Sequence, residues 1–278
     1  GDYFVSTTPI YDSRGRMTGT VHVARDITER KRMEQEILQK AEDLARSNAD
    51  LQQFAYVASH DLQEPLRTVT NYLSLLDRRY GDQLDDRAKE YVRVAIDGGS
   101  RAVELIRNLL DYSRIDSRAK PMEPTDMEAV LRTVLDNLQA QVREEKASVT
   151  HDPLPTILAD EGQMAALLQN LISNGIKFHG PDDPLVHISC KEDDGRLLFA
   201  VRDNGIGIDP RYNDQIFQLF KRLHTMDKYP GTGIGLAIAK KIVERHGGTI
   251  WLESELNQGT TFFFTVPLGT QVGRAMAR

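Results

Sequence analysis

The sequence predicts an α+β protein: a dimeric helical hairpin, which forms a four-helix bundle in the dimer, followed by a two-layer α/β sandwich domain. Three observations lead to this prediction. Apolar residues recur every seven positions along a long stretch without turn residues. A second helical stretch follows after a short break at 79–82. Short strand-like segments then alternate with long helical ones, which is typical of helices packed on a sheet.

The composition excludes several classes of protein. A net charge of −6 argues against a broad nucleic-acid surface, which needs a basic face. Cys190 is the only cysteine, so an intrachain disulfide and a cysteine zinc cluster are excluded, and a reducing, cytoplasmic setting fits. The chain contains no run of about 18 apolar residues, so the sequence predicts no membrane segment in it. Because Gly1 opens directly into strand-like sequence, we expect a missing N-terminal part that holds a sensor or a membrane anchor.

Residues 1–28 read as two strands, 3–10 and 19–26, on either side of a turn at 12–16. A lone hairpin is only marginally stable in water. We therefore expect it to pack on sequence outside this chain or on a second copy.

Residues 29–58 predict a coiled-coil signalling helix. The heptad positions d are Ile37, Leu44, Leu51 and Ala58, and the positions a are Ala41, Asn48 and Ala55. This pattern predicts a short parallel coiled coil, and hence a homodimer. The alternative is an amphipathic helix inside a monomer, but the absence of turn residues favours the long helix.

Residues 59–116 complete a helical hairpin whose helices run from about 48 to 113. The seam continues at Leu62, Val69 and Leu76, and a second amphipathic helix follows at about 85–113. Two such hairpins make a four-helix bundle. Gly98 and Gly99 lie mid-helix at a cost in helix propensity, which indicates close packing or a bend.

A linker at 117–125 leads to the second domain, 126–268, and the chain ends in a tail at 269–278. Thr125 and Glu128 have the spacing of a capping box, which predicts a helix from there to about 145. Further helices are predicted at 161–178 and 233–246, and strands at 147–151, 156–159, 185–190, 197–203, 249–254 and 260–266. This alternation predicts a mixed sheet with helices on it.

The segment 59–65, SHDLQEP, is the first candidate for chemistry. His60 takes an f position of the heptad, which faces solvent. An exposed imidazole can act as a nucleophile while a neighbouring carboxylate, here Asp61, accepts its proton. Pro65 can bend the helix just past the site. An isolated exposed histidine is more often plain surface, so the assignment depends on the other motifs.

Asn170, Asn174 and Lys177 recur at helical spacing and share one face. Amide oxygens suit Mg²⁺, which keeps most of its waters and binds phosphate oxygens. Lys177 supplies a point charge for phosphate. The alternative is an ordinary amphipathic helix with its polar side in water.

Asp203 follows a predicted strand and precedes Gly205 and Gly207. A carboxylate at a strand end can accept a hydrogen bond from an exocyclic amine such as that of adenine, and glycines allow close backbone approach. A second glycine cluster at 231–236 opens a helix, where backbone N–H groups bind phosphate. No strand directly precedes it, and no GxxxxGK[ST] exists, so a dinucleotide fold and a P-loop are excluded. The long connection 209–230 between the clusters is typical of a lid, from which Arg222 and His224 can reach phosphate, and the alternative is a solvated loop.

In chain order the motifs are SHDLQEP, NLISNGIKF, DNGIGI, FQLF, GTGIGL and GTTFFFTVP. Over about residues 30–268 the chain resembles sensor histidine kinases, most closely the phytochrome-like subgroup. These join a histidine phosphotransfer hairpin to an ATPase domain of the gyrase, Hsp90, histidine kinase and MutL type. The residues around 26–30 resemble the end of a PAS sensor domain.

The resemblance implies roles for individual residues. His60 is the phosphoacceptor, Asp61 its acidic partner and Asn174 the Mg²⁺ ligand. The implied ATP-binding set is Asn170, Asn174, Lys177, Phe178, Asp203, Gly205, Gly207, Arg222, Gly231, Thr232, Gly233, Gly235 and Leu236. Two positions depart from the pattern: Gly175 replaces the usual Ala, and Glu64 stands where many relatives that also dephosphorylate their partner have Thr or Asn.

The expected function is ATP- and Mg²⁺-dependent autophosphorylation of His60 and phosphotransfer to an aspartate of a response-regulator receiver domain on a separate chain. The first alternative is an ATP-hydrolysing dimeric clamp of the same superfamily. Those enzymes carry a water-activating Glu four residues before the Mg²⁺-binding Asn, where this chain has Asn170. The second alternative, a catalytically inactive scaffold, is disfavoured because every expected nucleotide residue is present. The input signal and the identity of the response regulator stay open.

Overall fold

The computed structural model describes residues 1–117, 120–213, 215–223, 229 and 231–268, with the backbone alone for part of the first helix and the end of the second. The chain divides into two compact units, 1–55 and 56–278, which are considered separately. No helix in the described part of the chain is apolar enough over a sufficient length to cross a membrane.

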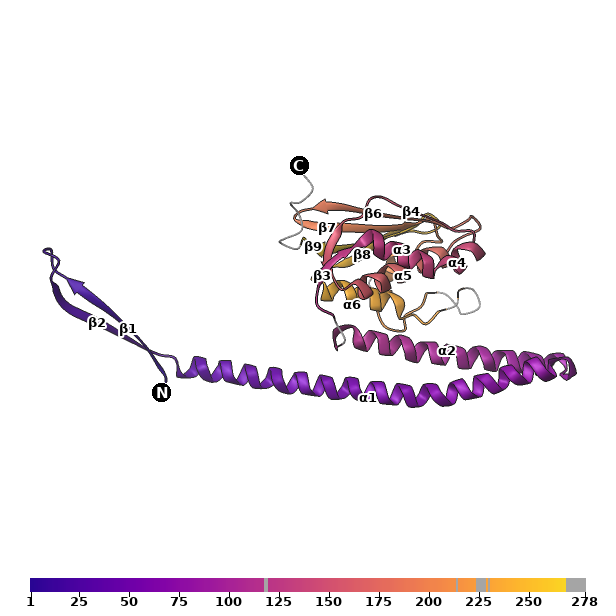
Figure 1. The fold of residues 1–278 in the computed structure, drawn as a ribbon, viewed down its shortest axis with the longest axis horizontal. Helices are drawn as coiled ribbons and strands as arrows, with labels where there is room; N and C mark the ends of the chain where they lie inside the picture. Colours follow the sequence, from indigo (N-terminus) through magenta and orange to yellow (C-terminus); the bar gives the residue numbers. More distant parts are fainter. Residues whose placement is uncertain (118–119, 214, 224–228, 230, 269–278) are drawn as a thin grey trace. The chain divides into compact units, whose positions relative to one another are not determined.

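The first unit opens with the antiparallel hairpin of β1 (Tyr3–Tyr11) and β2 (Met17–Asp26), as predicted (Figure 1). Asp12 shapes the turn, because its Oδ1 accepts hydrogen bonds from the backbone N–H groups of Arg14 and Arg16, both at 2.8 Å. The large apolar side chains of the hairpin are exposed, among them Tyr3, Phe4, Val5, Ile10 and Tyr11. Its packing partner therefore stays a prediction.

Helix α1 (Thr28–Tyr80) begins in the first unit and continues into the second without interruption, also through Pro65. The long helix predicted by the heptad pattern is confirmed. Ile37 and Leu44, at d positions, are exposed in the single chain. The side chains of Ala41, Asn48, Leu51, Ala55 and Ala58 lie outside the described ones.

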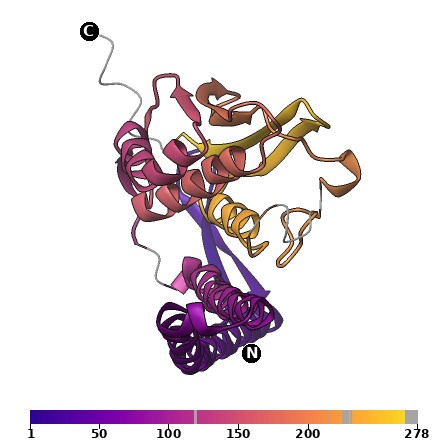
Figure 2. The same cartoon turned by 90° about the vertical axis from the view of Figure 1, so that its right-hand side faces the viewer.

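In the second unit, the end of α1 turns through η1 (Gly81–Gln83) into α2 (Asp86–Ser117), and the two helices lie side by side in both views (Figures 1 and 2). A Cβ on Gly99 of α2 would overlap the hydroxyl of Thr70 on α1. Gly99 therefore allows the close packing that its mid-helix position predicts.

The α/β part has a five-stranded sheet in the order β4-β6-β7-β9-β8. Only β4 and β6 pair in parallel, so the sheet is mixed, as predicted. Helices α3, α5 and α6 cover one face of it, which makes the two layers (Figure 1). The bounds are α3 Met127–Asn137, β4 Ser148–His151, α5 Glu161–Lys177, β6 Leu185–Asp193, β7 Arg196–Asp203, α6 Gly235–Arg245, β8 Ile250–Glu255 and β9 Gly259–Pro267.

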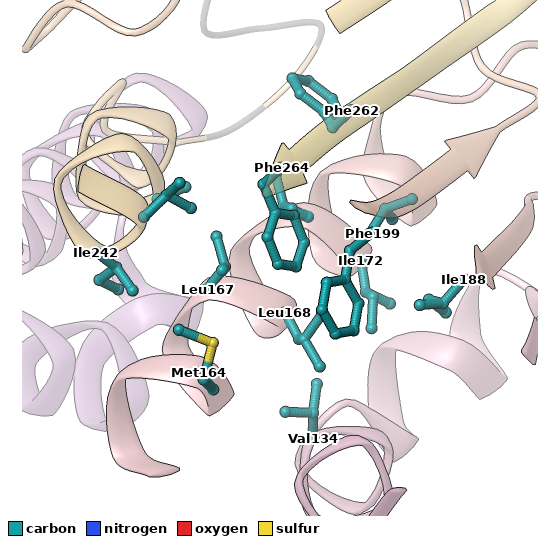
Figure 3. Packing of buried hydrophobic residues seen from close by; sticks show 14 of the residues in the cluster. Val134, Met164, Leu167, Leu168, Ile172, Ile188, Phe199, Ile242, Phe262 and Phe264 are labelled. Atoms are coloured by element: carbon teal, nitrogen blue, oxygen red, sulfur yellow. The ribbon is translucent and has the colours of Figure 1, made fainter. Parts of the chain in front are cut away.

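The core lies between α5 and the sheet (Figure 3). Phe199 of β7 and Phe264 of β9 are register partners, so they share a face, and their rings stack with centroids 4.8 Å apart. Leu168 and Ile172 of α5 are fully buried against this layer. The apolar side of α5 thus fixes the helix on the sheet and turns its polar side outward.

The capping box predicted at Thr125 is wrong. Residues Glu123–Asp126 form a strand, β3, which pairs with β5 (Thr156–Ala159), and the Thr125 hydroxyl donates to the carbonyl of Ala159 at 3.1 Å. Asp126 caps α3 instead, accepting from the N–H of Glu128 at 3.0 Å. Because Thr125 pairs with residues of β5 that are distant in the sequence, it lies in a strand and does not cap α3.

Two helix boundaries also differ from the predictions. The single helix expected up to about 145 is divided at Leu138 into α3 and α4 (Gln139–Glu144). Helix α6 begins at Gly235 rather than 233, because Gly233 has a φ of 73°, which is outside the helical region.

Candidate functional site

A cavity of about 510 Å³ lies between α5, the two glycine clusters and α2. It gathers residues from segments that are far apart in the sequence. The predicted residues that line it are Asn170, Asn174, Lys177, Phe178, Asp203, Gly207, Arg222, Gly231, Thr232, Gly233, Gly235 and Leu236. Gly205 is not among the lining residues. Its backbone N–H donates a hydrogen bond to Asp203, which does line the cavity.

Helix α5 supplies one wall. Asp160 caps it, accepting from the N–H of Gln163 at 3.3 Å. The amide nitrogen of Asn170 donates to the carbonyl of Ala166 at 2.8 Å, and a Cβ on Gly235 would lie 2.5 Å from Asn170 Oδ1. Gly235 therefore lets the start of α6 come close to the polar face of α5.

Asn174 lies one turn beyond Asn170 and also faces the cavity. The described residues contain no cluster of three His, Cys, Asp or Glu side chains that would bind a metal by itself. One amide oxygen still fits Mg²⁺, because this ion keeps several waters and takes its other ligands from substrate phosphates.

Asp203, at the end of β7, also lines the cavity. Its Oδ1 accepts hydrogen bonds from the N–H groups of Gly205 at 2.9 Å and Thr260 at 3.0 Å. Burial raises the pKa of this carboxyl to about 6, and the two hydrogen bonds oppose that rise. Both of these bonds go to Oδ1, and no hydrogen bond to Oδ2 is found among the described residues.

The first glycine cluster passes between the end of α5 and β8. A Cβ on Gly205 would overlap the carbonyl oxygen of Phe178, and one on Gly207 would overlap that of Glu255. Gly207 also has a φ of 68°, which side chains disfavour. The N–H of Ile206 donates to the Phe178 carbonyl at 2.9 Å. These contacts explain why the loop needs glycine at both positions.

Two cations lie near the second glycine cluster. Burial, and after it the charge of Arg222, lowers the pKa of Lys177. Its Nζ lies 4.5 Å from the centre of the Phe178 ring and would be 2.5 Å from a Cβ on Gly231. Arg222 Nη2 donates to the carbonyl of Tyr229 at 2.9 Å, and the Tyr229 ring packs on Phe178 with centroids 5.1 Å apart. His224 lies outside the described residues.

One wall of the cavity was not predicted. Glu104, Asn108 and Asp111 of α2 also line it, and Asn108 Nδ2 donates to the hydroxyl of Thr232 at 2.9 Å. Their spacing of four and three residues places them on one helical face. The sequence offered that spacing as a signal, but nothing in it indicates which partner the face meets.

The candidate phosphoacceptor segment lies apart from this group, on α1. Asp61 and Glu64 are exposed there, and neither lines the cavity. The side chain of His60 lies outside the described ones. The structure thus gathers the residues that the sequence predicts to bind a nucleotide and places the SHDLQEP segment on a separate helical element.

Two family models match the chain. Residues 50–118 match the His Kinase A (phospho-acceptor) domain, and residues 159–270 match the histidine kinase-, DNA gyrase B-, and HSP90-like ATPase. The first match covers the helical hairpin with SHDLQEP, and the second covers most of the cavity lining.

Curated relatives agree with both matches. Cyanobacterial phytochrome A of Nostoc sp. is 52% identical over 86% of this chain and 31% of its own length. Phytochrome-like protein Cph1 of Synechocystis sp. is 46% identical over 86% of this chain and 32% of its own length. The chain thus spans about a third of the length of these relatives.

Among solved structures, full-length ShkA in complex with AMPPNP aligns with a TM-score of 0.60 at 29% identity, covering 81% of this chain and 48% of that one. Its order of helical hairpin and α/β domain is the one seen here. From these matches, the chain belongs to the sensor histidine kinases.

Proposed function

We propose that this chain is an ATP-dependent protein-histidine kinase, which phosphorylates its own His60 and passes the phosphoryl group to an aspartate of a response-regulator receiver domain on a separate chain. The observation that carries the proposal is the cavity, whose lining includes the carboxylate of Asp203, the cations Lys177 and Arg222, and the second glycine cluster. Its volume of about 510 Å³ suits a nucleotide.

The cavity orients the nucleotide from its two ends. Oδ2 of Asp203 accepts a hydrogen bond from the adenine amine, while Oδ1 is held by Gly205 and Thr260. Lys177 and Arg222 lie at the other end and bind the phosphates. The start of α6 at Gly235 adds backbone N–H groups, which favour an anion.

Asn174 is the residue that would hold Mg²⁺. When bound, the ion neutralises charge on the phosphoryl group being transferred. The residues of the chain do the positioning: Asn174 faces the cavity from the same side of α5 as Lys177. Truncation of Asn174 should therefore remove phosphoryl transfer without unfolding α5, whose apolar face is untouched.

The transfer step is a displacement at phosphorus. A ring nitrogen of His60 forms a bond to the γ-phosphorus, the bond to the β–γ bridging oxygen breaks, and ADP leaves. The proton on the other ring nitrogen goes to the carboxylate of Asp61. In the second transfer the N–P bond breaks and the aspartate of the receiver domain forms an acyl phosphate.

The competing function, ATP hydrolysis by a clamp, lacks the base that those enzymes carry four residues before the Mg²⁺-binding Asn. A carboxylate would have to stand at position 170, but Asn170 carries an amide whose nitrogen is bound to the carbonyl of Ala166. An amide does not accept a proton from water at neutral pH. This favours a nucleophile from the helical hairpin over activated water.

A homodimer is part of the proposal. The hairpin exposes large apolar side chains along both helices, which are Leu62, Val69, Tyr72, Leu75, Tyr91 and Val94. A second hairpin packed on them would make a four-helix bundle and bury this surface. A parallel coiled coil at 29–58 would add to the same dimer contact, and the exposed hairpin β1–β2 fits the end of a PAS-like domain. A cytoplasmic location is proposed because the reaction consumes ATP.

The test is incubation of the whole chain with γ-labelled ATP·Mg²⁺, followed by addition of candidate receiver domains. We expect label on the chain that is acid-labile and alkali-stable, as an N–P bond is, and its movement to one receiver domain. Asn174→Ala should lose the label, and Asn137→Ala, an exposed asparagine of α3 outside the cavity, should keep it. Release of inorganic phosphate without labelled protein would favour the clamp.

A further inference from the structure

Lys177 combines two features that make a lysine side chain nucleophilic. It is half-buried at the end of α5, where its Nζ lies over the Phe178 ring, 4.5 Å from the ring centre. The guanidinium of Arg222 lies close enough for its charge to act on the amine. Desolvation and a neighbouring cation both favour the neutral amine, which is the form that attacks an electrophile.

The charges around Lys177 agree with this description. Burial, foremost, and then the charge of Arg222 lower the pKa of its amine, while the charge of Glu104 opposes them. At neutral pH the neutral fraction of this amine is therefore larger than that of an ordinary lysine. Because Lys177 also lines the cavity, a small molecule that enters the cavity can reach the amine.

The same part of the cavity carries the groups that hold a phosphate. A Cβ on Gly231 would lie 2.5 Å from Lys177 Nζ, and a Cβ on Gly233 would lie 2.9 Å from Arg222 Cγ. The two cations thus lie against the second glycine cluster at positions two residues apart. Helix α6 begins directly after the cluster, at Gly235, and backbone N–H groups at a helix start attract an anion.

An acyl phosphate has the chemistry that fits this combination. Its phosphate group is the anion that Arg222 and the start of α6 attract, and one bridging oxygen joins the phosphorus to an electrophilic carbonyl carbon. The cavity, of about 510 Å³, has room for so small a molecule. Binding by the phosphate holds the carbonyl carbon near the amine of Lys177, which replaces a bimolecular encounter with a reaction inside one complex.

We propose that Lys177 is a modification site, at which an acyl phosphate transfers its acyl group to Nζ. The amine nitrogen forms a bond to the carbonyl carbon, the bond from this carbon to the bridging oxygen breaks, and inorganic phosphate leaves with the proton that the amine loses. The amide product carries no charge, so the cavity loses one of its two phosphate-binding cations. The inference rests on the proposed nucleotide-binding function, because the acyl phosphate occupies the place of the nucleotide phosphates.

The test is the acetylation rate of individual lysines in the full chain, incubated with acetyl phosphate at pH 7.5 and followed by peptide mass spectrometry. Lys240 is the internal control, because it is an exposed lysine of α6 outside the cavity, paired with Glu244 at 3.8 Å. We expect Lys177 to react about tenfold faster than Lys240. Saturating AMPPNP·Mg²⁺ should slow the reaction of Lys177 and leave that of Lys240 unchanged.

Two variants and a second reagent test whether the phosphate directs the reaction. Arg222→Gln removes a phosphate-binding cation and should slow acetylation of Lys177 to about the rate of Lys240. Arg132→Gln, at an exposed arginine of α3 outside the cavity, should leave both rates unchanged. Acetic anhydride carries no phosphate, so with this reagent the preference for Lys177 over Lys240 should be lost.

Calorimetry with AMPPNP·Mg²⁺ separates this inference from the proposed function. Lys177→Gln, whose side chain is neutral like the acetylated one, should bind AMPPNP about tenfold more weakly than the wild type. Equal acetylation of Lys177 and Lys240, or a Lys177 rate that AMPPNP does not change although it binds, overturns the modification site and leaves the kinase proposal standing. A wild-type chain that does not bind AMPPNP overturns the proposed function itself.

Discussion

The backbone N–H of Asp160 donates a 3.1 Å hydrogen bond to Nε2 of His246, 86 residues away. The other ring nitrogen, Nδ1, lies 2.7 Å from the carbonyl of Ile242, to which it must donate. Only the neutral ring satisfies both contacts. His246 thereby joins the cap of α5 to the end of α6, two helices that line the cavity.

This contact predicts a loss of stability in mild acid. Burial, foremost, lowers the pKa of His246 below its ordinary value of 6.5. The unfolded chain therefore binds the proton more readily than the folded one. The contribution of His246 is fully present above about pH 6.5 and is lost as pH falls towards the lower pKa of the folded state. Thermal unfolding at pH 7.5 and 5.5 measures it.

Two variants separate His246 from other acid effects. His246→Gln should be less stable at pH 7.5 but should lose less on acidification than the wild type. His187→Gln, at a partly buried histidine of β6, should lose as much stability on acidification as the wild type. An equal acid loss in His246→Gln and the wild type would show that other groups are responsible.

Asp203 predicts a pH dependence of nucleotide binding. Its pKa of about 6, raised by burial, means that the carboxyl is ionised at pH 7.5 and largely protonated at pH 5. The ionised form is the better acceptor for the adenine amine, so affinity should fall as pH drops through about 6. Asp203→Asn should weaken binding at pH 7.5 by about tenfold or more, as for a hydrogen bond to a charged group.

The remaining pH dependence of Asp203→Asn reports the titration of groups other than Asp203, among them the nucleotide phosphates. Titration calorimetry with ADP at both pH values gives the comparison. If wild type and variant show the same pH dependence, the carboxyl of Asp203 does not contact the nucleotide.

Gly207 and Gly195 form a matched pair for the first glycine cluster. Both have positive φ, 68° and 72°, but a Cβ on Gly207 would overlap the carbonyl of Glu255 while nothing lies within 4 Å of one on Gly195. Gly195→Ala should cost about 1–2 kcal/mol for the left-handed backbone alone. Gly207→Ala should cost about 1–3 kcal/mol more from overpacking and should also weaken ADP binding. Urea unfolding measures both, and equal costs would contradict the steric account.

Glu64 bears on the reverse reaction, removal of phosphate from the partner. It lies exposed on α1, one helical turn beyond His60. Its carboxylate would meet an anionic phosphoryl group, so we expect weak phosphatase activity that rises in Glu64→Thr. The decay of a phosphorylated receiver domain with each protein measures this. Strong acceleration by the wild type that the variant loses would reverse the conclusion.

The sequence predicted elements where one local pattern dominates. The heptads of α1 and the polar face of α5 with Asn170 and Asn174 were read from periodicity, and the structure has helices there. The glycine clusters were found because few residues other than glycine tolerate such backbone and such close contacts.

Features that depend on distant partners were missed. Thr125 looked like a helix cap, but pairing of β3 with β5 took it into a strand. Leu138 interrupts the helix that periodicity alone would continue. One face of α2 carries Glu104, Asn108 and Asp111. That this face lines the cavity is visible only in the structure, where Asn108 contacts Thr232. Local propensity cannot predict these contacts, because they join residues that are far apart in the sequence.

The most direct test of the central claim is the site of phosphorylation. The chain and its His60→Gln variant are incubated with γ-labelled ATP·Mg²⁺, and the Kd for AMPPNP is measured in parallel. Because His60 lies on α1 and its neighbours Asp61 and Glu64 are not among the residues that line the cavity, we expect the variant to lose the acid-labile label while its Kd stays within about twofold of the wild type. Undiminished labelling of His60→Gln would show that another residue accepts the phosphoryl group and would contradict the account.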